Sequence, residues 1–460
     1  MNKILNKSLI FLILVSIGVQ CIGVYAKKHP LNFYCTIDPE DREAARNNPR
    51  TLYALNLAKN SIYKIEQIDK EVARKQLDSN FALGLLQNPA YKVDDGDKNY
   101  AFKHPDSSFA EQISQKSSYE ITETDRKFLR NNPHSKLSLG LIHNPNYQVS
   151  EFDKEYARNN PGSDFAKEIA KNKKYKINYD DKLILYNFPK SKFAEGLVRN
   201  FGFRVELEDK LFARENINEL TSSILTQLST YQVEFDDKII ARSNINTSFA
   251  SGLSLNKGYK IEQDDRDIVR TNVDSKFTFG LCLNENYKVE PKDKEIAKAH
   301  PNSKFAEAIG RNISYYVDNE DRDFVIKYPN TQLAKSLVQN TNFKIKEPQK
   351  EFARANVKSS VAKLAKTQSY KITLKDRKSA RENLNSEFAY SITINPSYKI
   401  EEIDKEIARN NPDTRFAEGL IQNTRYYIEL EDKKVARRNT TSKFAYGLSL
   451  KLLQCAYIPK

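Results

Sequence analysis

The sequence predicts an all-α fold, an α-solenoid of about fifteen 28-residue repeats, each with two helices and a short extended link. The first observation is a fixed period: an Asp followed by Lys or Arg recurs every 28 residues. The second is that each repeat holds two short segments with one apolar face. Helices this short are marginal alone, so their apolar faces have to be buried against neighbouring repeats. A fixed period of this length is typical of a solenoid.

The repeats are numbered here from the Asp, which is position one. The spacing is 28 residues except for 27 between Gln349 and Asp376. The starts are Asp41, Asp69, Asp97, Asp125, Asp153, Asp181, Asp209, Asp237, Asp265, Asp293, Asp321, Gln349, Asp376, Asp404 and Asp432. Residues 27–40 match the last part of a repeat. We therefore expect a partial repeat over 27–40 and a tandem array over 41–460.

The residues around the Asp predict the first helix of each repeat. A Glu, Asp, Thr or Ser usually stands three residues before it, as Thr122 does before Asp125, which resembles a capping box with Asp in the usual place of Glu. Position five is small or aliphatic. Position eight is usually Asn, and Pro follows it in eight repeats, as in Asn411 and Pro412, so the helix is expected to end there.

The second helix is expected to begin after position eleven, which is Ser or Thr in fourteen repeats and suits an N-cap. Phe at thirteen, Ala at fourteen and Leu or Ile at seventeen form its apolar face, as in Phe416 and the residues after it. Asn at position twenty, for example Asn423, is expected to end the helix in the left-handed conformation. Glycines at position sixteen, such as Gly84 and Gly196, are expected to mark close helix approach.

An aromatic residue at position twenty-three and Ile or Val at twenty-five predict a short extended link. The aromatic row, which includes Tyr63 and Tyr91, resembles a set of stacking platforms, but the aliphatic neighbour favours a core position. Two repeats are irregular. The one from Asp209 has Glu219 at the N-cap position, and the one from Gln349 lacks the Asp and one residue; these are bends or simple sequence drift.

Residues 1–26 combine a lysine-bearing start, an apolar run and small residues before the expected cleavage point, which predicts a secretory signal peptide. The run is shorter than the ~20 residues that a membrane span needs. Removing residues 1–26 takes away two lysines and no acidic residue, so the formal charge falls from +14 to +12. We expect an exported chain that is periplasmic, at the cell surface or extracellular, with no membrane span. The Lys, Asn and Ile usage indicates a bacterium with an AT-rich genome.

The sequence offers little support for catalysis or metal binding. It contains none of the common hydrolase, metalloprotease or phosphate-loop motifs, and His104 and His300 occupy position eight, where they are expected to cap helices. The Asp at position one is expected to cap a helix or to pair with a basic residue, in preference to binding calcium. Cys35, Cys282 and Cys455 form no framework, and Cys35 and Cys455 can meet only if the solenoid closes on itself or pairs with another molecule. We expect no enzyme activity, cofactor, metal or disulfide.

Arginine at position six is the candidate binding feature. It lies on the same helix face as the basic residue at position two, away from the core, so stacking aligns it into a ladder that suits an anionic partner. Pairing with acidic residues of neighbouring repeats is the equally weighted alternative. The ladder comprises Arg46, Arg74, Arg130, Arg158, Arg214, Arg242, Arg270, Arg354, Arg381, Arg409 and Arg437.

The run from Ala408 to Pro412, followed by Thr414 and an aliphatic helix, resembles short α-solenoid repeats. The nearest are those of the leucine-rich-repeat variant family, and HEAT-like repeats are a looser likeness. Those families usually place one residue between Ala and Asn-Pro, whereas this chain has two, and its repeat is longer. The resemblance implies a solenoid and carries no active site.

Two functions follow from these patterns. The first is an exported scaffold that binds a protein or an anionic polymer through the basic face, with no nucleic-acid partner expected. The alternative is a structural component of the cell envelope or surface whose repeats associate with copies of themselves.

Overall fold

The computed structural model describes residues 35–367 and 370–455, and the predicted signal peptide lies outside them. Within these ranges the chain forms twenty-nine α-helices and one 3₁₀-helix, with no β-strand. The prediction of an all-α fold is confirmed. None of the helices in the described ranges combines the length and the apolar character that crossing a membrane requires.

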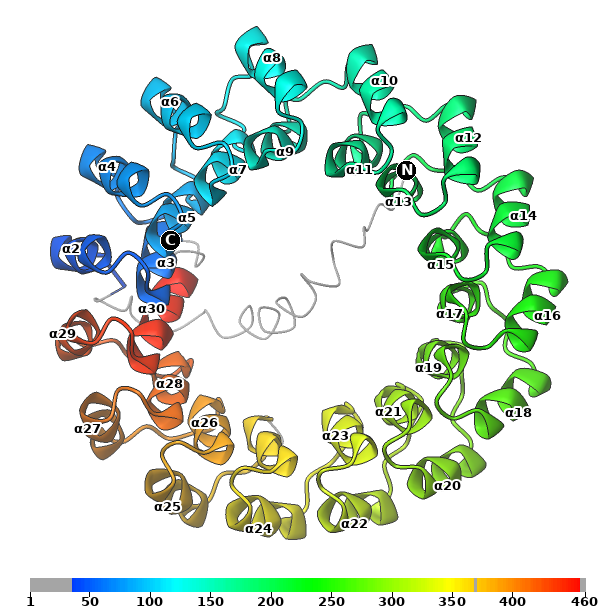
Figure 1. Cartoon of the computed structure of the whole chain (residues 1–460). Coiled ribbons are helices and arrows are strands. Elements are labelled where there is room, and N and C mark those ends of the chain that lie inside the picture. The colour runs from blue at the N-terminus through cyan, green and yellow to red at the C-terminus, as the bar shows by residue number, and fades with distance from the viewer. Residues whose placement is uncertain (1–34, 368–369, 456–460) are drawn as a thin grey trace, which may run out of the picture.

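The helices alternate between an outer and an inner layer (Figure 1). The outer helices are α2 (Pro39–Asn47), α4 (Gln67–Lys75), α6 (Asp95–Lys103), α8 (Glu123–Asn131), α10 (Glu151–Asn159), α12 (Tyr179–Asn187), α14 (Leu207–Glu215), α16 (Phe235–Ser243), α18 (Gln263–Thr271), α20 (Pro291–Ala299), α22 (Asn319–Lys327), α24 (Glu347–Ala355), α25 (Leu374–Glu382), α27 (Glu402–Asn410) and α29 (Leu430–Arg438).

The inner helices follow the second half of each sequence repeat. They are α3 (Leu52–Lys59), α5 (Asn80–Gln87), α7 (Ser108–Ser114), α9 (Lys136–His143), α11 (Asp164–Lys171), α13 (Lys192–Val198), α15 (Leu220–Gln227), α17 (Ser248–Ser254), α19 (Lys276–Leu283), α21 (Lys304–Arg311), α23 (Gln332–Gln339), η1 (Ser360–Lys366), α26 (Glu387–Ile394), α28 (Arg415–Gln422) and α30 (Lys443–Cys455).

The two layers form a closed ring, and the last helix pair packs against the first (Figure 1). Helix α30 contacts α3, and α29 contacts α2. Across this seam Asn56 Nδ2 donates to Ser449 Oγ at 3.0 Å, and Arg437 Nε donates to Asp41 Oδ1 at 2.7 Å. Of the two routes by which the chain ends could meet, the structure shows closure of one chain on itself.

The ends of the helices agree with most of the sequence signals. In the second repeat, the Glu66 N–H donates to Asp69 Oδ2 at 2.7 Å and completes the capping box of α4. Ser79 Oγ accepts from the Ala82 N–H at the start of α5. His104 and His300 are the C-caps of α6 and α20, as expected.

Asn at position twenty corrects one expectation. It ends the inner helix in an extended conformation, with φ −67° and ψ 129° at Asn88, and not in the left-handed region. Its buried side chain explains its presence, because Asn88 Nδ2 donates to the carbonyl oxygens of Ala58 and Asn60 in the preceding repeat at 2.9 and 2.7 Å. Asn144, Asn200, Asn284 and Asn423 make the same pair of bonds. These bonds satisfy carbonyl groups that the helix ends leave open.

Small residues bring the inner helices together. A Cβ added to Gly84 would lie 2.4 Å from the carbonyl oxygen of Leu55 on the preceding inner helix, and one added to Gly196 would lie 2.2 Å from that of Lys167. The expectation that these glycines mark close approach is confirmed. On the outside, long Arg and Lys side chains bridge neighbouring helices. Each repeat is therefore narrower inside than outside, which curves the stack toward closure.

The aromatic row is part of the core. Tyr63, Tyr91 and Tyr147 have at most 2% of their surface exposed and pack with the Phe and Ala residues of the inner helices. The interpretation as core is confirmed. In the repeat from Gln349 the missing residue is absorbed locally, because its inner helix is the 3₁₀-helix η1, which needs fewer residues for each turn.

The expectation that no disulfide forms is wrong. Cys35 is disulfide-bonded, to a partner outside the side chains that the structure describes, whereas Cys282 is a buried free thiol.

Candidate functional site

The Asp at position one is the centre of a hydrogen-bond cluster at each junction between repeats. Asp69 is fully buried, and its Oδ1 accepts from Arg46 Nε at 2.6 Å and from the Tyr63 hydroxyl at 2.9 Å. Both donors belong to the preceding repeat, and the other carboxylate oxygen caps α4. A buried charge is tolerated when it is paired and hydrogen-bonded in this way. The cluster therefore joins one repeat to the next.

A second acidic residue and a second basic residue complete the junction. Arg46 Nη2 donates to Glu66 at 2.7 Å, so the guanidinium contacts both carboxylates of the next repeat. In the following repeat, the position-two residue Lys70 donates to Asp94 at 2.7 Å, and its ammonium lies 4.9 Å from the centre of the Tyr91 ring.

Burial and charge pairing shift the pKa values of these groups in consistent directions. Burial raises the pKa of the Tyr63 hydroxyl, and the neighbouring Asp69 carboxylate raises it further. Partial burial opposes ionisation of Asp94, but hydrogen bonds from Lys70 and from the Asp97 N–H outweigh it and lower the pKa of Asp94 to about 2. Asp94 is therefore ionised at neutral pH, whereas the Tyr63 hydroxyl keeps its proton and can donate it to Asp69.

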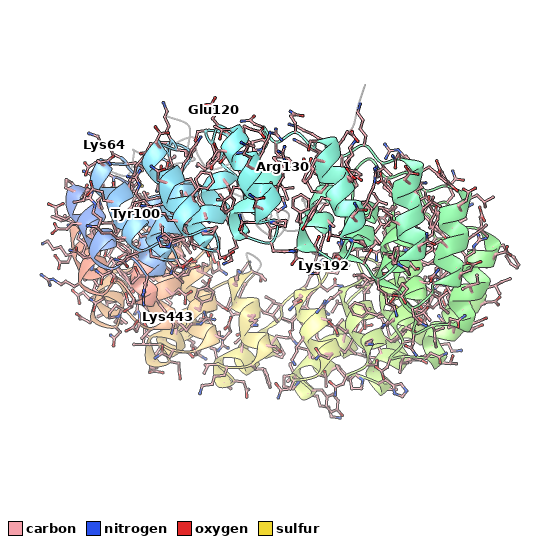
Figure 2. All side chains as sticks on the ribbon, turned by 45° about the horizontal axis from the view of Figure 1, so that its top comes forward. Lys64, Tyr100, Glu120, Arg130, Lys192 and Lys443 are labelled. Carbon is pink, nitrogen blue, oxygen red and sulfur yellow. The ribbon has the colours of Figure 1, made fainter. Side chains whose placement is uncertain are left out.

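All eleven ladder arginines form an ion pair, and ten of them occupy this junction. Ten of them contact the Asp of the next repeat, and for Arg437 that repeat is the first one. These ten are Arg46, Arg74, Arg158, Arg214, Arg242, Arg270, Arg354, Arg381, Arg409 and Arg437. Arg130 instead pairs with Glu123 of its own helix at 3.2 Å and lies on the outer wall (Figure 2). The geometry is that of the pairing alternative, and ligand binding by these arginines stays a prediction.

All three positions of the cluster change together at one junction. Where Gln349 replaces the Asp, the preceding repeat has Ile326 in place of Arg and Phe343 in place of Tyr. At Asp209 the arrangement is permuted: the link carries Phe203, and the hydroxyl comes from Tyr186 at position six, 2.8 Å away. At the seam Cys35 occupies the aromatic position, and Tyr53 donates to Asp41 at 3.3 Å instead.

The seam differs from the other junctions in two respects. Helix α30 has thirteen residues against eight in α28, so it continues through the position where other inner helices end. Asn60 Nδ2, which would donate to carbonyl groups at that point, is buried with no partner among the described residues. Lys451 takes the place of Asn in this helix and donates to the Asn423 carbonyl oxygen.

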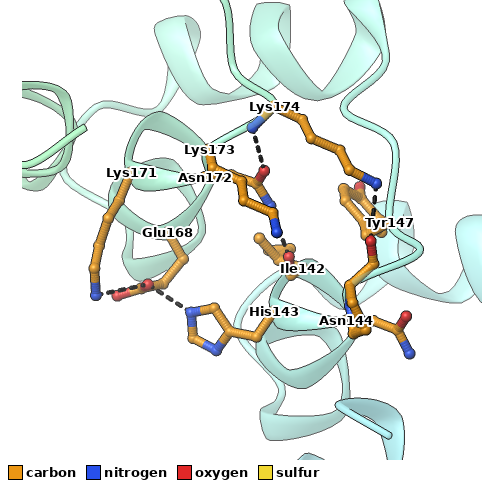
Figure 3. Close-up of a pocket in the computed structure, with 10 residues that line it drawn as sticks. Ile142, His143, Asn144, Tyr147, Glu168, Lys171, Asn172, Lys173 and Lys174 are labelled. Carbon is orange, nitrogen blue, oxygen red and sulfur yellow. Dashed lines mark hydrogen bonds and ion pairs between the residues drawn. The ribbon is translucent and has the colours of Figure 1, made fainter. Parts of the chain in front are cut away.

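A hollow of about 290 Å³ lies between α9 and α11 (Figure 3). Within it, Glu168 Oε2 is 2.7 Å from His143 Nε2 and 3.6 Å from Lys171 Nζ. The hydrogen bond to His143 lowers the pKa of Glu168 against the effect of its burial. This carboxylate therefore links the inner helices of two neighbouring repeats. No group of His, Cys, Asp and Glu in residues 35–367 and 370–455 has the arrangement of a metal site.

Sequence reasoning missed the Tyr–Asp bond, whereas it included pairing of the arginines with acidic residues of neighbouring repeats as one of two alternatives. The signal was present, because an aromatic residue precedes the repeat start by six residues in fourteen of the fifteen repeats and is Phe343, without a hydroxyl, where Gln349 replaces the Asp. Comparison with known proteins adds no family: no family model matches the chain, and no curated protein or solved structure matches it either. Its function is therefore argued from the ring alone.

Proposed function

We propose that the chain is an exported α-solenoid of about fifteen two-helix repeats, closed into a ring, that acts as a non-enzymatic scaffold for a protein partner. The observation that carries the proposal is the seam. Lys433 and Arg437 contact Asp38 and Asp41 at 2.7 Å each, as Lys70 and Arg74 contact Asp94 and Asp97 within the array. The surface by which each repeat contacts the next is therefore occupied at both ends of the array, because the last repeat contacts the first.

Closure of the ring argues against the alternative function, a structural component that associates with copies of itself through its repeats. An open solenoid presents a terminal face that has to be capped and that invites stacking with another copy. In the ring both terminal faces are covered, so growth by adding repeats end to end is disfavoured. A scaffold that meets its partner through side chains on the ring's walls fits better than a component that assembles through its repeats.

The partner-binding surface is assigned to side chains that do not take part in the contacts between repeats. Arginines at position six hold the repeats together, so recognition falls to exposed positions that differ between repeats. A closed stack with a fixed internal junction and variable walls is suited to binding proteins, as repeat proteins in general use extended surfaces for recognition.

Two measurements on residues 27–460 test the proposal. Light scattering is expected to give the mass of a single chain over a wide concentration range, and a pull-down from the exported fraction of the source cells is expected to retain a protein partner. Concentration-dependent growth into large assemblies would instead favour the structural component.

A further inference from the structure

Three consecutive outer helices carry exposed aliphatic residues where the rest of the array is polar. Position three is Leu183 in α12, Leu211 in α14 and Ile239 in α16, with 37, 47 and 44% of their surface exposed. The other twelve repeats have Glu, Asp, Lys or Asn at this position. Single exposed apolar residues are common on protein surfaces, but the same change in three neighbouring repeats places them in one row.

A second row lies beside the first. Tyr179, Leu207 and Phe235 are the first residues of α12, α14 and α16, and they are 69, 61 and 69% exposed. Each precedes the position-three residue of its helix by four residues, so the two side chains lie on one helix face. These six residues form what we name the outer apolar stripe, and the helices that carry them, α12, α14 and α16, belong to the outer layer of the ring (Figure 1).

Acidic residues accompany the stripe. Asp180, Glu208 and Asp236 each follow one of the first-row residues directly, are exposed, and have no ion pair among the described residues. The acids of the repeat junctions are paired, whereas these three carboxylates are free to meet a basic partner, as are exposed acids of other outer helices such as Glu71. The stripe is thus apolar with an acidic border.

We infer that the outer apolar stripe docks a basic amphipathic helix of a protein partner, an inference that rests on the proposed scaffold function. The outer helices diverge because each repeat is wider outside than inside, so their spacing exceeds the ~8–10 Å between packed neighbouring helices. Two to three turns of a helix advance by about 11–16 Å, so a docked helix whose apolar residues repeat every two to three turns meets α12, α14 and α16 in turn. Its Lys and Arg residues face the three carboxylates. The same carboxylates repel an anionic lipid surface, so a protein helix fits the stripe better than a membrane does.

The test uses the mature chain and a synthetic Leu/Lys peptide of about 18 residues, long enough to cross three repeats as a helix. The stripe variant is Leu183→Asn, Leu211→Asn and Ile239→Asn, which removes the apolar side chains without adding charge and installs the residue that another repeat carries at this position, Asn99. Glu71→Gln, Glu155→Gln and Glu295→Gln form the matched control at the same position elsewhere. Thermal melts confirm that each variant is folded.

We expect the peptide to bind the wild type and the control alike, and to bind the stripe variant roughly tenfold or more weakly. Asp180→Asn, Glu208→Gln and Asp236→Asn should weaken binding and reduce its dependence on salt. Equal binding to the stripe variant, or equally tight binding of a Leu/Glu peptide, would overturn the inference.

Other occupants give different results. A concentration-dependent dimer that the stripe variant abolishes would identify a second copy of the chain, and stripe-dependent retention on phosphatidylglycerol vesicles without peptide binding would identify lipid; either result overturns the inference. If the pull-down partner is retained equally by the stripe variant and the wild type, the scaffold function stands and the docking site fails.

Discussion

Arg437 Nε in α29 donates to Asp41 Oδ1 in α2 at 2.7 Å, across 396 residues of sequence. The same bond joins Arg409 to Asp432 in adjacent repeats at 2.8 Å. The first and last repeats are therefore neighbours in the same chemical sense as any two consecutive ones. The predictions below follow from this shared junction.

The junction should behave as a unit under mutation. Arg242→Ile leaves the buried carboxylate of Asp265 without its cation, and removing one partner of a buried pair costs about 3–5 kcal/mol. Adding Tyr259→Phe and Asp265→Gln reproduces the set that the chain itself uses at Ile326, Phe343 and Gln349. We expect the triple variant to melt at a higher temperature than the single one. A triple variant that melts below it would show that the three residues act independently.

The arginines should stabilise the ring and not bind anionic polymers. Arg242→Gln, Arg270→Gln and Arg409→Gln are expected to lower the melting temperature, because each of these arginines bridges to the next repeat. Retention on heparin, measured on the same samples, should be unchanged. Loss of retention with an unchanged melting temperature would restore the ligand-binding interpretation of the ladder.

These results show what the sequence could predict. The 28-residue period, the N-cap at Ser79 and the capping box at Asp69 depend on local pattern, so they are visible in a single repeat. Asn88 was misassigned because its role depends on carbonyl groups of the repeat before it. Ring closure could not be derived from the repeat pattern. It depends on the sum of small angles between successive repeats, and close contacts such as that of Gly84 with Leu55 set these angles. The outer apolar stripe appears only when the repeats are aligned and their exposure is known.

The ring should lose stability in acid. The folded-state pKa of Asp94 is about 2, below its ordinary value, because Lys70 and the Asp97 N–H favour the carboxylate. Its contribution is present above about pH 5 and is lost as the pH falls toward 2. We expect the melting temperature to fall over this range. The difference between wild type and Asp94→Asn should be largest at pH 7 and vanish near pH 2; a constant difference would contradict the assignment.

Lys451 should oppose stability at neutral and lower pH. Burial lowers its pKa from 10.5 to about 7, although Asp432 acts in the opposite direction. The unfolded chain holds this proton up to about pH 10, so the wild type gains stability as the pH rises from about 7 to about 10. Lys451→Met should therefore raise the melting temperature most at pH 6 and least at pH 10. A stabilisation that grows with pH would refute this sign.

The closed ring is tested most directly by a cross-link across the seam. Asn56 Nδ2 and Ser449 Oγ lie 3.0 Å apart, so the variant Asn56→Cys and Ser449→Cys places two thiols side by side. Under mild oxidation, peptide mapping of the monomer should show a disulfide between positions 56 and 449, formed at a rate independent of protein concentration. Each single variant controls for exchange with Cys35, Cys282 and Cys455. A monomer with no such bond, or a bond found only between molecules, would contradict closure of the chain on itself.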